Sequence, residues 1–323
     1  MKEFLAGYIS GASVDLTRVR DREGHIELRE YARYLSRDFR DFGSILELYL
    51  KKHKREYAAA CFGVAGPVLQ NEVTTTNLPW HIIGKHIEKK FTIPQVKLIN
   101  DIVATAHGLQ HVQAERFFTI NAGLKGHAGN VGLVAAGAGL GEALIYVENS
   151  HIHPYASEGG HADFAPGNQL ETELWEYLYS EMGQVEVEDI VSLRGLENIF
   201  NFLIEALGGR RVEWFDTSQD RPAAIIEHAL AGTDETAVRT LDIFIDCYAS
   251  EAANLALKGM TTGGIYIGGL IAPQIITAMD KGRFMERFVK RGKMEALLAK
   301  MPVGVIIEEK TALLGAGSVA LAL

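Results

Sequence analysis

The sequence predicts a two-domain α/β protein with mixed sheets and a cleft between the domains. Three observations favour this class. The chain of 323 residues is longer than the roughly 250–300 residues at which a single core usually stops growing. Apolar runs typical of strands alternate with helical periodicity in two successive stretches. The composition, 47% hydrophobic and 23% charged, is that of ordinary globular proteins.

The first stretch predicts three strands followed by helix, strand, helix and strand. The strands of the opening meander are separated by a turn at 21–24, and the first helix ends in a basic last turn, as the helix dipole favours. The predicted elements are strands 4–9, 14–19 and 25–31, a helix from Asp38 to 54, strand 58–64, helix 81–91, strand 96–99 and helix 102–109.

A second stretch repeats this rhythm from about Phe117. It predicts strands at 117–120, 131–135, 143–147, 265–267 and 303–307, and a helical segment at 169–257 interrupted by Gly208-Gly209 and by 216–221. We therefore expect a small domain formed by 1–102 with about 304–323, and a large domain at 103–303 that contains the helical insertion.

Composition excludes several functional classes. The net charge of −9 arises from 32 Lys and Arg against 41 Asp and Glu, without a basic stripe, which argues against a nucleic-acid partner. Cys61 and Cys247 are too few for a disulfide framework or a four-cysteine zinc site, and favour a reducing compartment. The N-terminal apolar run is too short for an export signal, and the uncharged segment 259–279 is broken by glycines and Pro273. We expect a cytoplasmic protein with no membrane partner.

The 33 glycines cluster, and the densest group follows an apolar strand. Residues 131–145 read VGLVAAGAGLGEALI, with Gly137, Gly139 and Gly141 at the predicted turn. Glycines at such a turn let backbone N–H groups approach a phosphate closely. A plain glycine-rich hairpin is an equally good interpretation of this segment alone.

Asn100 and Asp101 follow a buried strand, at a position that directs side chains towards a cleft. An amide and a carboxylate there can hold a hydroxyl group and accept its proton. The alternative, that the pair caps the following helix, fits the local sequence as well.

A third polar group lies in the segment SEGGHADFAP at 157–166. Glu158, His161 and Asp163 surround two glycines and offer acceptors and an imidazole suited to sugar hydroxyls. A single histidine with two carboxylates on a loop is weak evidence for a metal, so we predict no protein metal site.

These motifs occur in the order and approximate spacing of the bacterial glucokinase family, which the chain resembles over essentially its whole length. The matching segments are LIND (98–101), TNLPW (76–80), AGAGLG (136–141), SEGGHADFAP (157–166), VEDIVSLRGLENI (187–199) and GGIYIGGLIAP (263–273). The resemblance is to the non-zinc branch of the sugar kinases and implies the actin-like ATPase fold, which is related to ribonuclease H.

The resemblance implies phosphorylation of glucose at its 6-hydroxyl by ATP, with Mg²⁺ carried by the nucleotide. It makes Asp101 the base, and Asn100, Glu158, His161 and Glu188 the residues that bind the sugar. It also implies a homodimer. The glycines expected at the nucleotide are Gly7, Gly11, Gly137, Gly139, Gly268 and Gly269.

The nucleotide side departs from the family pattern at four positions. The first loop of the family resembles G-D-x-G-G-T-N, whereas this chain has Tyr8 at the acidic position and Ala12 at the threonine. Ala138 replaces a second threonine, and Leu270 a glycine. The departures leave three interpretations. The first is a working glucokinase in which backbone N–H groups still hold the phosphates and Mg²⁺ is held by ATP and water. The others are a hexose-binding sensor with weak or no kinase activity, and a kinase with a different phosphoryl donor.

Overall fold

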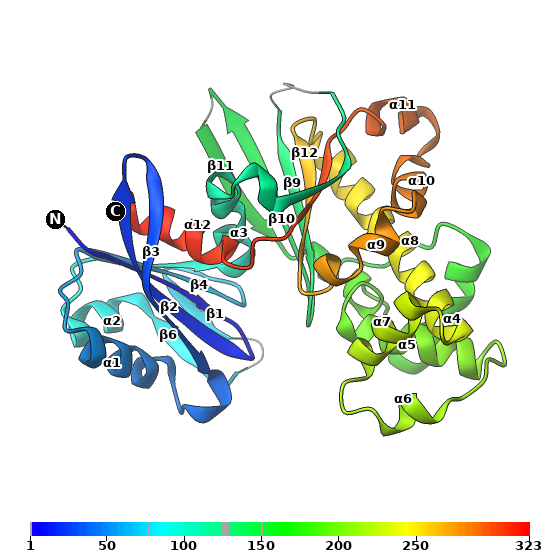
Figure 1. The fold of residues 1–323 in the computed structure, drawn as a ribbon, viewed down its shortest axis with the longest axis horizontal. Helices are drawn as coiled ribbons and strands as arrows, with labels where there is room; N and C mark the ends of the chain where they lie inside the picture. Colours follow the sequence, from blue (N-terminus) through cyan, green and yellow to red (C-terminus); the bar gives the residue numbers. More distant parts are fainter. Residues whose placement is uncertain (1, 76–77, 125–128, 150) are drawn as a thin grey trace. The chain divides into compact units, whose positions relative to one another are not determined.

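The computed structural model describes residues 2–75, 78–124, 129–149 and 151–323, so Thr76 and Asn77 of the TNLPW segment lie outside it. The chain divides into two compact units, which are described separately (Figure 1). Unit 1 comprises Met1–Arg116, Pro154–Ala156 and Glu308–Leu323, and unit 2 comprises Phe117–His153 and Ser157–Ile307. The domain limits expected near 102 and 304 stay predictions.

Unit 1 contains a five-stranded mixed sheet in the order β3-β2-β1-β4-β7. Strands β1, β4 and β7 run parallel, and β2 and β3 complete an antiparallel meander. The strands are β1 (Phe4–Ile9), β2 (Ser13–Arg22), β3 (His25–Leu35), β4 (Ala59–Val64) and β7 (Val96–Asn100).

All five of these strands were predicted. The antiparallel pair is longer than its alternating pattern suggested, because β2 runs on through Asp21 and Arg22. The turn is therefore confined to Glu23 and Gly24, whose φ angles of 55° and 84° are left-handed. Glycine adopts that conformation without steric cost.

Helices cover both faces of this sheet (Figure 1). Alternate residues of a strand point to opposite faces, so Leu5 and Ile9 join one hydrophobic cluster while Ala6 joins another. The first cluster includes residues of α1 and α2, and the second includes residues of α3 and α12. The helices are α1 (Phe42–His53), α2 (Gly84–Phe91), α3 (Asp101–Gly108) and α12 (Thr311–Leu321).

Two predicted helix starts were wrong. The helix expected from Asp38 begins at Phe42, because the Asp41 side chain accepts a hydrogen bond from the Ser44 N–H at 2.8 Å and caps the helix there. The expected helix 81–91 begins at Gly84. Its first three residues form the short strand β6 (His81–Ile83), which pairs with β5 (Glu72–Thr74).

Unit 2 contains a six-stranded mixed sheet in the order β11-β10-β9-β12-β13-β8. Strands β9, β12 and β13 are parallel, while β10 and β8 run antiparallel to their neighbours β9 and β13. Five strands were predicted and β11 was missed. The strands are β8 (Phe117–Asn121), β9 (Val131–Ala136), β10 (Leu140–Glu148), β11 (His151–Ser157), β12 (Gly264–Gly269) and β13 (Val303–Ile306).

The segment predicted to be helical forms five helices, and the break at Gly208-Gly209 is confirmed. Of the second predicted break, only residues 218–220 lie outside a helix. Three further helices follow β12. The helices are α4 (Gln169–Met182), α5 (Leu193–Glu205), α6 (Glu213–Thr217), α7 (Arg221–Ala231), α8 (Glu235–Gly259), α9 (Ile276–Met279), α10 (Arg283–Val289) and α11 (Glu295–Leu298).

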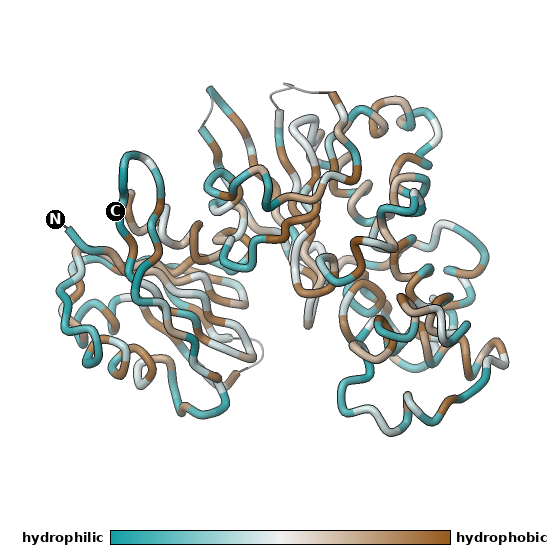
Figure 2. Tube along the Cα trace, viewed as in Figure 1, coloured by the Kyte–Doolittle hydropathy of each residue, from teal (hydrophilic) through white to brown (hydrophobic). Residues whose placement is uncertain are grey.

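Helix α8 runs through the middle of the unit 2 core. Fifteen of its side chains are buried, and it contacts β9, β12 and the helices α5, α7 and α10. Hydrophobic residues gather in the inner strands of each sheet and in the helices that cover it, whereas the outer hairpin β2–β3 and many loops are hydrophilic (Figure 2). Within the described ranges, no helix has both the length and the apolar character needed to cross a bilayer.

Candidate functional site

Asn100 and Asp101 lie at the carboxyl end of β7, where the strand passes into α3. Asn100 caps the helix: its Oδ1 accepts hydrogen bonds from the N–H groups of Ile102 (3.0 Å) and Val103 (3.4 Å). Its Nδ2 donates to the Gly66 carbonyl at 3.1 Å. The capping interpretation of Asn100 is therefore confirmed, and its side chain is held rigidly beside Asp101.

Asp101 is the first residue of α3. Its Oδ1 accepts a hydrogen bond from the Ile102 N–H at 2.9 Å. The positive end of the helix dipole favours a negative charge at this position. This position suits the carboxylate that a general base requires.

Tyr8, which stands where the family pattern has an acidic residue, lies in the same unit as Asp101. In the sheet register Tyr8 is directly beside Asp15 of β2 and Gly63 of β4. A Cβ added at Gly63 would lie 3.8 Å from the Asp101 Cα, so the strand position beside Tyr8 is close to the predicted base. Burial raises the pKa of Tyr8 well above its ordinary value, and the charges of Asp101 and Asp15 raise it further. The phenol is therefore neutral.

The Asp15 carboxylate is engaged by Arg33 and Tyr31. Its two oxygens accept hydrogen bonds from Arg33 at 2.7 and 2.8 Å, and Oδ1 also accepts from the Tyr31 hydroxyl at 3.0 Å. Gly7 has a packing reason to be glycine, since an added Cβ would lie 2.7 Å from Phe62. Gly11 lies outside the strands, between β1 and β2.

The second glycine loop joins β9 to β10 in unit 2. The two strands are antiparallel, and the Gly137 N–H donates to the Gly139 carbonyl at 2.8 Å, so this segment forms a β-hairpin. An added Cβ at Gly139 would lie 2.3 Å from Glu188 Oε2, and the same oxygen accepts from the Leu140 N–H at 2.7 Å. Glu188 therefore rests directly on this loop.

Gly268 and Gly269 end β12 beside that loop. Gly269 has a φ of 86°, and an added Cβ would lie 2.1 Å from the Ala136 carbonyl oxygen, so only glycine fits there. Leu270 is 63% exposed, with its side chain beside Gly137. The glycines predicted from two distant motifs thus meet at the carboxyl ends of two parallel strands, where ligands of α/β sheets commonly bind.

Glu158 and His161 flank the two glycines of a short 3-10 helix, η4 (Gly159–His161). His161 Nδ1 lies 2.8 Å from Glu186 Oε2. This hydrogen bond raises the pKa of His161 above its ordinary value, and the charges of Glu188 and Glu158 act in the same direction. Three of the predicted sugar-binding residues are therefore close enough to interact electrostatically.

Comparisons with known proteins match the chain to one family over nearly its whole length. A family model described as Glucokinase matches residues 5–323. A glucokinase of Trichormus variabilis (strain ATCC 29413 / PCC 7937) is 34% identical over 336 residues, 98% of each chain. One from Synechocystis sp. (strain ATCC 27184 / PCC 6803 / Kazusa) is 36% identical, over 80% of this chain and 78% of its own.

The chain belongs to the glucokinase family.

Solved glucokinase structures share its fold. A glucokinase from an Antarctic psychrotroph superposes with a TM-score of 0.87 at 25% identity, covering 100% of both chains. A Balamuthia mandrillaris glucokinase in complex with glucose gives 0.83 at 20%, over 99% of this chain and 94% of that one. A ROK family glucokinase from Streptomyces griseus with glucose and AMPPNP gives 0.68 at 18%, over 99% and 100%. The predicted actin-like ATPase fold of the hexokinase-type sugar kinases is confirmed.

Sequence reasoning missed Glu186, which contacts a residue of the candidate site. The residue lies one position before the matching segment 187–199 and 25 residues from its partner His161. Its own neighbours in the sequence carry no signal for this pairing. Glu186 also caps the 3-10 helix η5 (Val187–Asp189), which carries Glu188.

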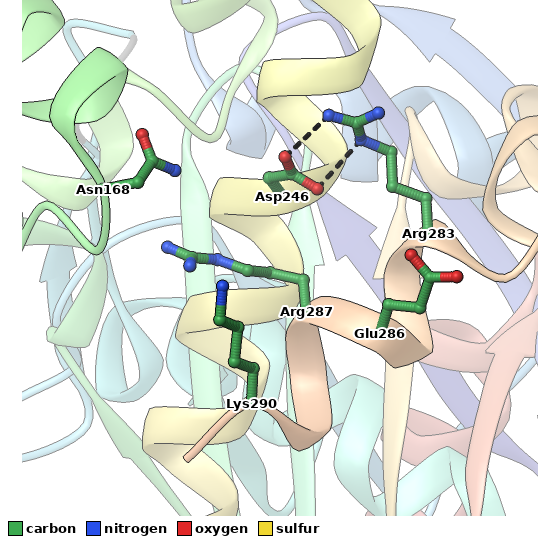
Figure 3. A pocket seen from close by; sticks show the side chains of 6 residues that line it. All are labelled: Asn168, Asp246, Arg283, Glu286, Arg287 and Lys290. Carbon is green, nitrogen blue, oxygen red and sulfur yellow. Dashed lines mark hydrogen bonds and ion pairs between the residues drawn. The ribbon is translucent and has the colours of Figure 1, made fainter. Parts of the chain in front are cut away.

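A cavity of about 350 Å³ opens elsewhere in unit 2, among α4, α8 and α10 (Figure 3). Arg283 forms two hydrogen bonds to Asp246, and Arg287 donates to the buried Glu171. These pairs neutralise the arginines, so we assign the cavity no part in the reaction. Its lining residues include none of the predicted site residues: Asn168, Asp246, Arg283, Glu286, Arg287 and Lys290.

Proposed function

We propose that this glucokinase-family protein transfers the terminal phosphoryl group of ATP to the 6-hydroxyl of glucose, giving glucose 6-phosphate and ADP. One observation carries the proposal. Glu158, His161 and Glu188 lie close enough in unit 2 to interact electrostatically, in a chain whose family match extends over residues 5–323. Carboxylates and an imidazole are suitable partners for the hydroxyl groups of a sugar.

Asp101 is the proposed general base. The sugar 6-oxygen attacks the terminal phosphorus, the bond to the bridging oxygen of ADP breaks, and the Asp101 carboxylate takes the hydroxyl proton. Asn100, fixed by its capping hydrogen bonds, orients the sugar beside it. Glu158, His161 and Glu188 hold the remaining hydroxyls, so that positioning supplies much of the rate.

The first loop does not offer a carboxylate for Mg²⁺. Tyr8 is a neutral phenol, and Asp15 beside it is engaged by Arg33. We therefore propose that Mg²⁺ arrives on the phosphates of ATP, where it neutralises their charge, and we derive no step through a protein-bound metal. Backbone N–H groups of the glycine loops are the proposed phosphate contacts.

We also propose a cytoplasmic homodimer. The two cysteines are buried free thiols, consistent with a reducing compartment. Tyr179 and Met182 of α4 are 48% and 43% exposed and would be covered in a dimer formed by the helical segment. Sedimentation equilibrium of the full chain tests the dimer.

Asp101→Asn tests the activity most directly. In an assay coupled to glucose 6-phosphate, with ATP and Mg²⁺, we expect kcat to fall by about 10²–10⁴-fold, because the amide cannot accept the proton. Asp38→Asn, an exposed position at the end of a 3-10 helix, is the matched control and should keep the wild-type rate.

A wild-type rate in Asp101→Asn would show that Asp101 is not the base. If the wild-type protein binds glucose by calorimetry but turns over no hexose with ATP or other donors, the hexose-sensor function replaces the kinase.

A further inference from the structure

Two acidic side chains are buried side by side beneath the turn that carries Glu158 and His161. Glu142 lies on β10 and is 2% exposed, and Glu251 lies on α8 and is 6% exposed. Their side chains interact directly. Two neighbouring carboxylates removed from water cannot both keep a negative charge without a large cost in free energy, so such a pair holds a proton.

The surrounding contacts indicate which member holds the proton. Glu251 Oε2 accepts a hydrogen bond from Asn254 Nδ2 at 3.0 Å, and its Oε1 lies 3.9 Å from the Lys258 ammonium. In contrast, Glu142 Oε1 is buried without a hydrogen-bond partner among the described residues. Glu251 is therefore the carboxylate and Glu142 the neutral acid. Burial, with the charge of Glu251, raises the pKa of Glu142 to about 8.

The turn of η4 lies directly on this acid pair. An added Cβ at Gly159 would lie 2.1 Å from Glu142 Oε2, and one at Gly160 would lie 2.2 Å from the Leu140 carbonyl oxygen. Both glycines are thus in close contact with β10. The Leu140 N–H at the start of the same strand donates to Glu188, so β10 touches both parts of the proposed sugar site.

We propose that Glu142 is a positioning residue for sugar binding: its protonated carboxyl group, shared with Glu251, supports the Gly159-Gly160 turn, and loss of that proton displaces the turn. This inference rests on the proposed function. The turn itself carries Glu158 and His161, so a shift of about an ångström there changes the geometry of both side chains towards a sugar. Glucose binding then depends on a proton that touches no substrate.

Few groups are available to balance a second charge at Glu142. On α8 the nearby titratable groups are Lys258, which already faces Glu251, and the neutral phenol of Tyr248. After α10, Arg291 interacts with Glu251. On the turn, His161 is paired with Glu186. An ionised Glu142 would therefore meet an existing carboxylate without a cation of its own.

Calorimetric titration of glucose into the full-length protein between pH 6.5 and 9.5 tests the proposal. In the wild type we expect the Kd for glucose to rise above pH 8, by about tenfold or more at pH 9.5, because each binding event must restore the proton. Glu142→Gln keeps a neutral hydrogen-bond donor and should remove this rise. Glu148→Gln, an exposed position on the same strand, is the matched control and should follow the wild type. His161 titrates in all three proteins, so the difference between them isolates Glu142.

A second variant and a second measurement support the test. Glu251→Gln removes the neighbouring charge, so the rise in Kd should begin at lower pH than in the wild type. The Tm measured without sugar from pH 5 to 8 reports whether Glu142 is protonated in the folded protein. The pKa of Glu142 is raised from 4.5 to about 8, so the stability gained from the neutral form is present at low pH and lost as pH rises towards 8. The wild-type Tm should fall relative to that of Glu142→Gln over this range.

The Tm profiles test the shared proton, and the Kd profiles test the positioning role of Glu142. Equal Tm profiles in the wild type and Glu142→Gln would overturn the shared proton. Different Tm profiles with identical Kd profiles would overturn the positioning role. If none of the proteins binds glucose at any pH, the proposed function is wrong and the sugar-positioning role with it, while the Tm profiles still report on the acid pair.

Discussion

Tyr8 shows how one residue alters the chemistry that a phosphate loop can offer. It stands where the family pattern has a carboxylate, and its phenol is kept neutral by burial and by the charges of Asp101 and Asp15. The nearest carboxylate across the strand, Asp15, is bound to Arg33 through two hydrogen bonds. The loop therefore contributes backbone groups but no free acidic side chain beside Tyr8.

Restoring the family residues should raise the rate. We expect Tyr8→Asp combined with Ala12→Thr to increase kcat by about tenfold or more at saturating Mg²⁺, since a single well-placed electrostatic contact is worth about 10²–10³ in rate. The same protein should be less stable, because a third carboxylate joins Asp15 and Asp101. Tyr8→Asn with Ala12→Thr has nearly the same shape without the charge, and a comparable gain in kcat there would refute the explanation.

His161 and Glu186 give a second prediction at this scale. The hydrogen bond from His161 Nδ1 to the Glu186 carboxylate raises the pKa of His161 above 6.5, so Glu186→Gln should lower it, as measured by NMR titration of the imidazole Cε1 proton. The pair stabilises the fold at pH values below 6.5, and this contribution is lost as pH rises through the raised pKa. The Tm of Glu186→Gln should therefore differ from the wild type mainly in acid. Glu176→Gln, exposed on α4, should leave the His161 titration unchanged.

The motifs predicted the five residues proposed to act at the sugar, but not the residues that contact them. The five are Asn100, Asp101, Glu158, His161 and Glu188. Asn100 and Asp101 are adjacent in sequence, so their place at the end of a strand is a local property. Glu186 and Glu142 act through residues that the fold alone brings near, and no local pattern of charge or hydrophobicity encodes such a contact. Their roles emerge only when side-chain distances are known.

At the scale of elements, the clearest strand signal comes from a strand that is buried on both faces. Strand β4 is buried at every position, and such a run is a strong apolar signal. Strand β11 has no fully buried residue and includes two histidines and Pro154, so its apolar signal is weak and it was missed. Its place at the edge of the sheet explains both properties, because an edge strand tolerates proline.

The crossing of α3 and α12 depends on glycine. An added Cβ at Gly315 would lie 1.7 Å from the Ala104 carbonyl oxygen, and one at Gly108 would lie 2.0 Å from that of Thr311. We expect Gly315→Ala to destabilise the protein by about 1–3 kcal/mol, because the clash is with backbone and the helices must separate. Chemical denaturation measures this change.

Gly43→Ala is the matched control for that crossing. The position lies in α1 of the same unit, and an added Cβ would meet its nearest atom at an ordinary 3.4 Å. Alanine favours the helix over glycine by up to about 1 kcal/mol, so this variant should be as stable as the wild type or slightly more stable. Equal destabilisation of both variants would contradict the importance of the close crossing.

At the scale of the whole molecule, the chain begins and ends in unit 1. After the strands and helices of unit 2, the last residues return as α12, which contacts β1, β2, β4 and α3. Its buried residues, among them Leu313 and Ala316, cover one face of the unit 1 sheet. Unit 1 is therefore completed only when the C-terminus has been added, although most of its sequence lies in the first third of the chain.

Ending the chain after Ile307 tests this dependence. Burial of Leu313 alone is worth about 1.5–3 kcal/mol, and the truncation also exposes the apolar face beneath α12, so we expect unit 1 to lose its cooperative unfolding transition. Unit 2 keeps its own core of α8 and the six-stranded sheet and should retain a transition in calorimetry. Removing only Ala322 and Leu323, which are exposed, is the control and should leave the unfolding profile of the full chain unchanged. Protease digestion of the longer truncation should then cut within residues 2–116 first, and equal resistance of both units would show that unit 1 folds without its last helix.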